Sequence, residues 1–442
     1  MVAMIRSGEL SPDELLAAHL GEIERVNPTI NAFTALSPQR GNAAGPLYGI
    51  PVTVKDSFDV AGFATRCGSL LRSSRPAEED STAAARLRAA GAVILGKTNC
   101  PDLLMCYETD NLLTGRTNNP WDPQRTSGGS SGGEAAAIAA YCSAGGVGSD
   151  AGGSIRVPAH FCGIAGLKPT PGRVPATGHY PSVTHPSGLL GVAGPMARSA
   201  EDVRLLFEVL AGHDEQDPFS APVPLRSPDL AGLRIGLVEQ FYSVPVQGPV
   251  RRAVAGAAGA LRELGFPVEP FALHGLERAP NLWWMIFGRV TAFFVKRMLG
   301  DREAEVGDLL REMLEQGTAE PAPSMQEVVE TLVARDRMRG ALLRSMRNHA
   351  VLLLPVCGIV AFPHRARRFA TDGKTIGLFE AMMPTVLANV LGLPAVTIPF
   401  EVSEEGLPVG IQLIGRPYDD ELLLELAVRL ERLRGPLASP PL

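Results

Sequence analysis

Near its middle the chain reads TSGGSSGGEAAAIAAYCSAGGVGSDAGGSIRVP, residues 126–158. Two glycine-flanked serines in this stretch, Ser130 and Ser154, stand 24 residues apart. The alanine-rich run between them suits one helix, and the residues after it suit a short strand. Glycines around a serine let backbone N–H groups approach whatever the hydroxyl touches, because no Cβ intervenes. Such a backbone suits acyl transfer, in which preorganised N–H donors stabilise an oxyanion.

Composition is that of an ordinary globular protein. The chain has 442 residues, 45% of them hydrophobic, with a net charge of −6. That mild charge argues against a nucleic-acid-binding surface. We see no run of 18 apolar residues, so no transmembrane helix is expected, and residues 1–6 do not form a signal peptide. Six scattered cysteines indicate free thiols in a reducing compartment, so we expect a cytoplasmic protein.

The order of helical and extended patterns predicts an α/β layered fold. A capping-box spacing at Ser11 and Glu14 predicts the start of the first long helix. In the first half, residues 49–56 and 92–95 are predicted strands, and residues 80–90 a predicted helix. In the second half, strands are predicted at 233–238, 351–355, 387–399 and 409–414, and helices at 199–211, 250–264 and 420–434. Residues 213–232 carry several prolines and are expected to form a surface linker. Residues 118–125 are polar and interrupted by prolines, so no strand is expected there.

Residues 281–347 are expected to be mostly helical. The aromatic side chains of residues 283–294 could line a substrate pocket, face a membrane or pack in the core, and the sequence leaves these alternatives open.

Three short motifs match known signatures but lie in the wrong context. Residues 91–98 fit the phosphate-binding loop pattern, yet the residues that should form the loop are themselves a predicted strand. Residues 146–151 fit a dinucleotide fingerprint but no helix opens directly after them. Residues 128–132 fit the nucleophile elbow, but no strand is expected before them. A nucleotide-binding protein that uses Lys97 remains the alternative from a different functional class.

The remaining constellation contains no histidine. The backbone N–H groups of Ala151, Gly152, Gly153 and Ser154 can converge on one oxygen. Lys55 ends an apolar strand, where desolvation lowers the pKa of an amine and lets it act as a base. Ser130 could relay a proton between Lys55 and Ser154. The structural alternative is a glycine turn with capping serines.

These motifs resemble the amidase signature family. The resemblance rests on residues 128–133 and 148–158, and on the lysine strand at residues 51–56. It extends from residues 31–33 to residues 392–395 and 410–412. It implies a single α/β/α domain over residues 1–442, built around a large mixed, mostly parallel, twisted sheet. Residues 45–212 would carry the catalytic groups, and residues 233–442 would complete the sheet and the pocket.

The resemblance also implies roles for individual residues. Ser154 matches the nucleophile, Ser130 the bridging serine and Lys55 the base. The loop from Ala151 to Ser154 matches the oxyanion hole. Ser131, Asp150 and Arg156 match supporting positions. No cofactor and no metal are implied.

Within the family, the sequence looks closest to the fatty acid amide hydrolases. Residues 131–134, 107–111 and 119–121 carry that likeness. The alternative is the A-type component of a glutamyl-tRNA amidotransferase, whose tyrosine-rich glutamine-binding stretch is replaced here by residues 281–287. We therefore expect hydrolysis of a linear amide, either fatty or aryl, with esters as side substrates. The expected partner is a small-molecule amide, and the chain could act alone or as a homodimer.

Overall fold

A large mixed sheet crosses the protein. The computed structural model describes residues 1–183 and 187–442. Within them, an 11-stranded sheet has the order β1-β3-β2-β6-β8-β7-β14-β15-β11-β9-β10. Its strands in chain order are β1 (Phe33–Arg40), β2 (Pro51–Lys55), β3 (Val93–Thr98), β6 (Gly145–Asp150), β7 (Ala165–Lys168), β8 (Val192–Ala197), β9 (Ile235–Leu237), β10 (Val268–Pro270), β11 (Val351–Pro355), β14 (Ala395–Val402) and β15 (Pro408–Gly415).

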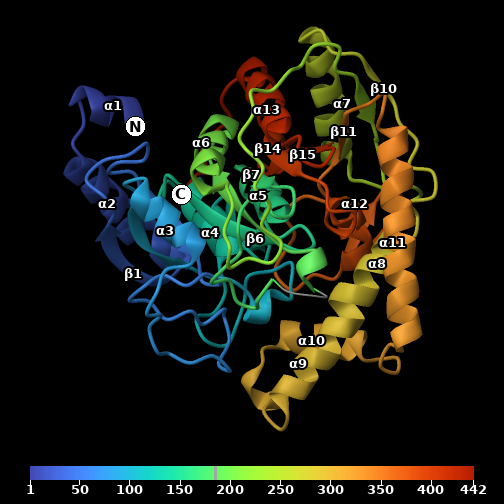
Figure 1. Ribbon diagram of the computed structural model, residues 1–442, viewed down its shortest axis with the longest axis horizontal. Coiled ribbons are helices and arrows are strands. Elements are labelled where there is room, and N and C mark those ends of the chain that lie inside the picture. Colours follow the sequence, from blue (N-terminus) through green and yellow to red (C-terminus); the bar gives the residue numbers. More distant parts are fainter. Residues whose placement is uncertain (184–186) are drawn as a thin grey trace.

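Helices cover both faces of this sheet (Figure 1). In chain order they are α1 (Val2–Ser7), α2 (Pro12–Ile30), α3 (Thr82–Ala89), α4 (Gly132–Ala139), α5 (Arg156–Cys162), α6 (Ala200–Leu210), α7 (Gly248–Glu263), α8 (Ala279–Trp283), α9 (Thr291–Leu299), α10 (Asp308–Gly317), α11 (Met325–Ser345), α12 (Leu378–Val390) and α13 (Asp420–Arg434). Short 3₁₀ turns occur at Asp102–Leu104, Ser187–Leu189 and Glu303–Glu305, and a π-helical segment, η3, spans Trp284–Val290.

Two buried clusters form the layers on either side of the sheet. One joins the sheet to α3, α6, α7 and α13. The other joins it to α5, α8, α11 and α12. The expected α/β/α layering around a large mixed sheet is therefore confirmed. Helices α9 and α10 extend below the sheet in Figure 1 and pack on each other. None of the helices in the described part of the chain is long and apolar enough to cross a membrane.

The sheet is not mostly parallel. Among the described strands, pairing is parallel at β2–β3, β2–β6, β9–β10 and β9–β11. The other six neighbouring pairs are antiparallel. The expectation of a parallel majority is wrong because β8 and β7 follow one another and pair antiparallel beside β6, and β14 and β15 form a long antiparallel pair.

Two local predictions are also wrong. The strand predicted at residues 387–399 is not one element, because α12 runs to Val390 and β14 begins only at Ala395. This run is buried throughout and mainly apolar, and such a run suits a buried helix as well as a buried strand. Residues 118–125 do contain strands, because β4 (Asn118–Asn119) and β5 (Asp122–Thr126) form a small hairpin outside the main sheet. Proline is tolerated at such an edge.

A second hairpin joins β12 (Arg368–Thr371) and β13 (Lys374–Gly377).

Candidate functional site

Lys55 is the last residue of β2, and every residue of this strand is buried. Its side chain is 0% exposed, and Nζ donates hydrogen bonds to Ser130 Oγ at 2.7 Å and to Ser149 Oγ at 3.1 Å. Burial lowers the pKa of Lys55 to about 8, because the neutral amine is easier to desolvate than the ammonium ion. A substantial fraction of Lys55 is therefore neutral at mildly alkaline pH.

Ser130 lies in the tight connection between β5 and α4. The Gly129–Ser130 peptide bond is cis. Only glycine fits at position 129, because a Cβ there would lie 2.6 Å from the carbonyl oxygen of Cys106. The backbone N–H of Ser131 donates to the carbonyl oxygen of Ser154 at 3.1 Å. The two glycine-flanked serine segments, far apart in the sequence, are thus joined directly.

Ser154 lies in the loop between β6 and α5. The carbonyl oxygens of Ala151 and Gly152 accept hydrogen bonds from Trp283 Nε1 and Tyr107 Oη, both at 2.8 Å. The N–H of Gly153 donates to Asp150 Oδ1 at 2.7 Å, so it is already engaged. The N–H groups of Ala151, Gly152 and Ser154 donate to no other group in the described residues. Three of the four expected donors are therefore free.

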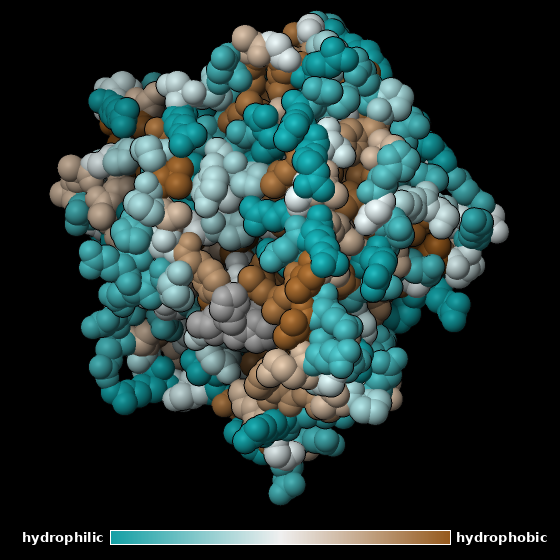
Figure 2. Space-filling view, turned by 45° about the vertical axis from the view of Figure 1, so that its right-hand side comes forward, coloured by the Kyte–Doolittle hydropathy of each residue, from teal (hydrophilic) through white to brown (hydrophobic). Residues whose placement is uncertain are grey.

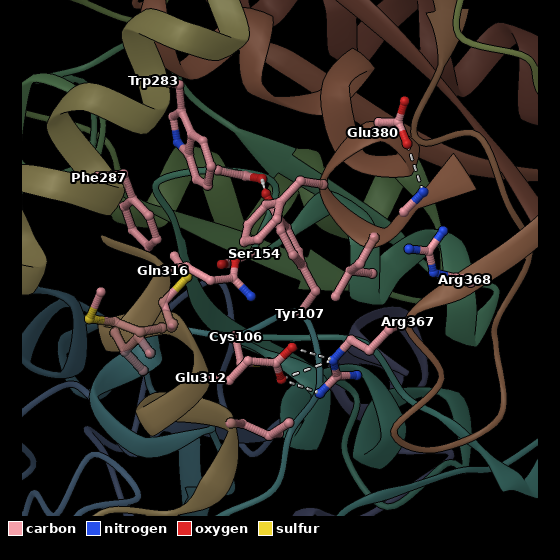
Figure 3. Close-up of a pocket in the computed structure, with 18 residues that line it drawn as sticks. Cys106, Tyr107, Ser154, Trp283, Phe287, Glu312, Gln316, Arg367, Arg368 and Glu380 are labelled. Carbon is pink, nitrogen blue, oxygen red and sulfur yellow. Dashed lines mark hydrogen bonds and ion pairs between the residues drawn. The ribbon is translucent and has the colours of Figure 1, made fainter. Parts of the chain in front are cut away.

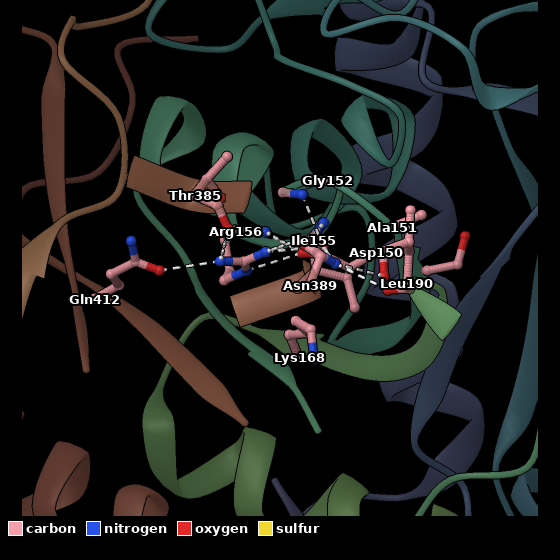
Figure 4. Close-up of polar contacts among 12 residues, drawn as sticks. Asp150, Ala151, Gly152, Ile155, Arg156, Lys168, Leu190, Thr385, Asn389 and Gln412 are labelled. Carbon is pink, nitrogen blue, oxygen red and sulfur yellow. Dashed lines mark hydrogen bonds and ion pairs between the residues drawn. The ribbon is translucent and has the colours of Figure 1, made fainter. Parts of the chain in front are cut away.

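A buried ion pair holds this loop (Figure 4). Arg156 Nε and Nη2 each contact a different carboxylate oxygen of Asp150 at 3.0 Å, and both side chains are 0% exposed. Burial alone would raise the pKa of Asp150, but the Arg156 guanidinium and its hydrogen bonds outweigh burial and hold that pKa well below its usual range. Asn389 of α12 donates to Asp150 Oδ1 at 2.9 Å, and Gln412 of β15 accepts from Arg156 at 3.1 Å.

Ser154 opens onto a cavity of about 330 Å³ (Figure 3). Trp283 and Phe287 stack at 4.7 Å on one side of it. An ion pair between Arg367 and Glu312 closes another side. The remaining lining is mainly apolar: Leu104, Met105, Tyr107, Leu309, Met313, Leu378 and Phe379. Ser154 also lines a smaller adjoining cavity together with Ser130 and Ser149.

The aromatic segment has more than one role. Trp283 and Phe287 line the cavity, whereas Phe294 is 62% exposed. The surface seen from the side of α8 and α11 is mostly hydrophilic, with apolar side chains gathered near its middle (Figure 2). Trp283 also belongs to a buried cluster, so of the three alternatives both pocket and core apply to this segment.

The candidate phosphate loop is not a loop. Residues Val93–Thr98 form β3, so their backbone is extended and cannot wrap a phosphate. Lys97 is buried, lies 3.2 Å from Asp56 and donates to Thr65 at 3.1 Å. The exclusion of this motif on its sequence context is confirmed by this geometry.

Sequence reasoning missed three functional contacts. Ser149 stands within the quoted motif, but nothing in the sequence shows that its hydroxyl reaches Lys55. Asn389 and Gln412 lie more than 230 residues from Asp150 and Arg156. The available signal for Gln412 is that it belongs to a stretch that carries the family resemblance. Tyr107, which contacts the carbonyl oxygen of Gly152, belongs to another stretch of this kind.

The chain is similar to known proteins along nearly its whole length. The Amidase family profile matches residues 14–424. The A-type component of the glutamyl-tRNA(Gln) amidotransferase of Chloroflexus aurantiacus is 34% identical over 477 aligned positions, covering 98% of this chain and 95% of that protein.

Solved structures are similar along nearly the whole chain. The structure of 6-aminohexanoate cyclic dimer hydrolase with its substrate has a TM-score of 0.87 and 29% identity, covering 99% and 97% of the two chains. A fatty acid amide hydrolase has a TM-score of 0.86 and 25% identity, covering 98% of this chain and 84% of that one. Special closeness to the fatty acid amide hydrolases is not confirmed. The family profile and the identity over almost the full length show that the chain belongs to the Amidase family.

Proposed function

We propose that this protein hydrolyses carboxylic acid amides through an acyl-enzyme, with Ser154 as nucleophile, Ser130 as proton relay and Lys55 as base. The observation that carries the proposal is the 2.7 Å hydrogen bond from the buried Lys55 Nζ to Ser130 Oγ, beside the cavity that Ser130 and Ser154 both line. A neutral lysine can accept a proton from a serine, and Ser–Lys pairs replace Ser–His pairs in several hydrolases.

The reaction would proceed in two halves. Ser154 Oγ attacks the amide carbonyl carbon, its proton passes to Ser130 Oγ, and the proton of Ser130 passes to Lys55 Nζ. The free N–H groups of Ala151, Gly152 and Ser154 are placed to stabilise the oxyanion. When the C–N bond breaks, the proton returns through Ser130 to the leaving amine. Water then cleaves the acyl ester by the same relay, and esters should react as well.

Asp150 and Arg156 would act by positioning. The carboxylate of Asp150, held by Arg156, accepts hydrogen bonds from the N–H groups of Gly153 and Ile155 at 2.7 Å and 3.1 Å. These bonds fix the course of the loop, so that the neighbouring N–H groups do not have to reorganise during the reaction. Ser131 would support the site through its bond to the carbonyl oxygen of Ser154.

The cavity supports an amide with a flat, apolar acyl part as substrate. The stacked rings of Trp283 and Phe287 and the side chains of Leu378 and Met313 provide apolar contact close to Ser154. Aromatic and aliphatic walls close to the nucleophile favour an apolar acyl group. An aryl amide is therefore the substrate candidate that this side of the cavity favours.

The second candidate is a glutaminase that works as one component of a complex. The 34% identical relative, named as part of an amidotransferase, favours it over a fatty or aryl amide substrate. Two residues that line the cavity also favour it. The side chains of Gln316 and Arg368 make no hydrogen bond or ion pair within the described residues, so both are free to bind a polar substrate group. This candidate predicts little glutamine hydrolysis by the isolated chain.

Labelling with a fluorophosphonate tests the chemistry independently of the substrate. Intact-protein mass should show one adduct on the wild type, none on Ser154→Ala, and slower labelling of Lys55→Ala. Labelling that survives in Ser154→Ala and disappears in Ser130→Ala would contradict the assigned roles. Hydrolysis rates for an anilide and for glutamine, with wild type and Arg368→Gln, then separate the two substrate candidates. Anilide turnover by the isolated chain would favour the aryl amide. Glutamine turnover that appears only when the partner components are added, and that Arg368→Gln lowers, would favour the glutaminase.

A further inference from the structure

Glu134 is a buried carboxyl group that the proposed reaction does not use. It lies in the first turn of α4, directly after the Ser130 segment, and is 0% exposed. Within the described residues, no lysine, arginine or histidine lies within ion-pair distance of it. The backbone of β6 closes the site, since a Cβ on Gly146 would lie 2.1 Å from Glu134 Oε1. A buried carboxylate without a cation is costly, so its protonation state needs an explanation.

One backbone carbonyl and two side-chain hydroxyls form a chain of close oxygen–oxygen contacts that ends on the carboxyl group of Glu134. Ser143 Oγ lies 2.8 Å from the carbonyl oxygen of Gly145. Thr53 Oγ1 lies 3.0 Å from Ser143 Oγ, and it is also within hydrogen-bond distance of Glu134 Oε1. On the other carboxyl oxygen, Thr98 Oγ1 lies 2.6 Å from Oε2.

Counting protons along this chain settles where they must lie. Each close oxygen–oxygen contact needs one proton between its two atoms. The three contacts from the Gly145 carbonyl to Glu134 need three protons, but Ser143 and Thr53 supply one each and a carbonyl supplies none. Thr98 uses its own proton on Oε2. The third proton of the chain must therefore come from the carboxyl group of Glu134.

We propose that Glu134 is a positioning residue of the active site that is held protonated by its place at the end of the chain through Thr53 and Ser143, and that its neutrality keeps Lys55 free to act as a base. The link to Lys55 rests on the proposed function, whereas the protonation of Glu134 does not. Burial also raises the pKa of Glu134, which is the direction that the proton count requires, while the hydrogen bond from Thr98 acts against it.

The effect on Lys55 follows from its surroundings. Thr53 and Lys55 are two residues apart on β2, so their side chains point to the same face. The acidic groups that act on Lys55 are the carboxyls of Asp150 and Glu134 and the thiols of Cys67 and Cys100.

The charge of Asp150 is balanced by Arg156, and nearby Asp56 is paired with Lys97. Glu134 therefore contributes a new negative charge only if it ionises. That charge would favour the ammonium form of Lys55, which cannot accept a proton.

Infrared spectroscopy tests the protonation state directly. The difference spectrum of wild type minus Glu134→Gln, recorded at the mildly alkaline pH at which Lys55 is partly neutral, should show the carbonyl stretching band of a protonated carboxyl group. Other protonated carboxyls are present in both proteins and cancel. Labelling wild-type glutamates with ¹³C should shift the same band, so the test does not depend on the folding of the variant. Absence of the band would overturn the proposal, whether or not the protein proves to be a hydrolase.

The pH dependence of amide hydrolysis tests the link to Lys55. Glutamine can donate to Thr53 and accept from Thr98, so Glu134→Gln should keep both contacts. We expect the acidic limb of kcat/KM to stay at the wild-type position. A limb that moves to lower pH in Glu134→Gln would show that a negative charge had been removed, and would overturn the proposal. Fluorophosphonate labelling of Ser154 in the same variant reports separately on the proposed function.

Discussion

Lys55 lies at the end of a fully buried strand, and this burial suits it for its proposed role as the base. Because burial lowers the pKa of this lysine to about 8, the neutral base becomes more abundant as pH rises through that value. We expect kcat/KM to rise with pH, with its midpoint near this pKa. Lys55→Met should abolish this rise with pH and reduce kcat/KM by about 10²–10⁴-fold, the usual contribution of a general base. A wild-type profile that is flat across this pKa would contradict the role of Lys55.

Ser149 is the second hydroxyl that Lys55 contacts, at 3.1 Å. In Ser149→Ala one buried N–H of the lysine loses its acceptor, and the amine is less firmly aimed at Ser130. We expect kcat to fall by about 10-fold, the equivalent of one hydrogen bond, with KM little changed. Steady-state kinetics measure both constants, and Ser149→Thr, which keeps a hydroxyl, should recover most of the rate. Equal loss in the Ala and Thr variants would show that packing and not the hydroxyl matters.

At the scale of elements, α12 carries a residue that fixes the loop between β6 and α5. Asn389 Nδ2 donates to the carboxylate of Asp150 at 2.9 Å and to the backbone carbonyl oxygen of Asp150 at 3.2 Å. It also donates to the backbone carbonyl oxygen of Leu190 at 3.1 Å. Asn389→Ala removes one donor from each of these buried groups, so we expect a loss of about 2–4 kcal/mol in the free energy of unfolding and a lower kcat. Urea denaturation should show the loss, whereas Asn118→Ala, at a partly exposed site, should change little. Full stability with unchanged kcat would refute the positioning role.

The same elements show where sequence reasoning succeeds and fails. The helix and strand between Ser130 and Ser154 are confirmed as α4 and β6, since local composition specifies them. The capping box predicted at Ser11 is present at the start of α2, because it depends on residues only three apart. By contrast, the end of α12 is predicted as a strand from the sequence. Its residues are buried on all sides, so the sequence lacks the alternation of polar and apolar residues that would distinguish a helix from a strand.

At the scale of the whole molecule, the site is assembled from both halves of the chain. Lys55, Ser130 and Ser154 come from the first half, and their types and spacing are informative. Trp283 and Asn389 come from the second half. They contact Ala151 and Asp150, at the start of the loop between β6 and α5, only because α8 and α12 pack beside that loop. Contacts between residues this far apart depend on the completed fold, so patterns in one sequence do not predict them.

Buried lysines should also make the stability of the whole protein depend on pH. Lys168 ends β7 and donates to the carbonyl oxygens of Leu393 at 2.8 Å and Pro169 at 3.2 Å. Burial lowers the pKa of Lys168 from 10.5 to about 7. Between these values the unfolded chain binds a proton that the folded protein lacks, so stability should rise with pH across this window.

Lys168→Met removes that linkage. Its free energy of unfolding, measured by urea denaturation, should rise less steeply with pH than that of the wild type, by up to about 1.4 kcal/mol per pH unit for one proton. Lys55 and the other buried titratable groups are the same in both proteins, so the difference between the two slopes reports on Lys168. Lys374 is exposed, so Lys374→Met should follow the wild-type slope. If Lys168→Met and wild type were parallel above neutral pH, Lys168 would be charged in the folded protein, and the two carbonyl oxygens would be binding an ammonium ion in the core.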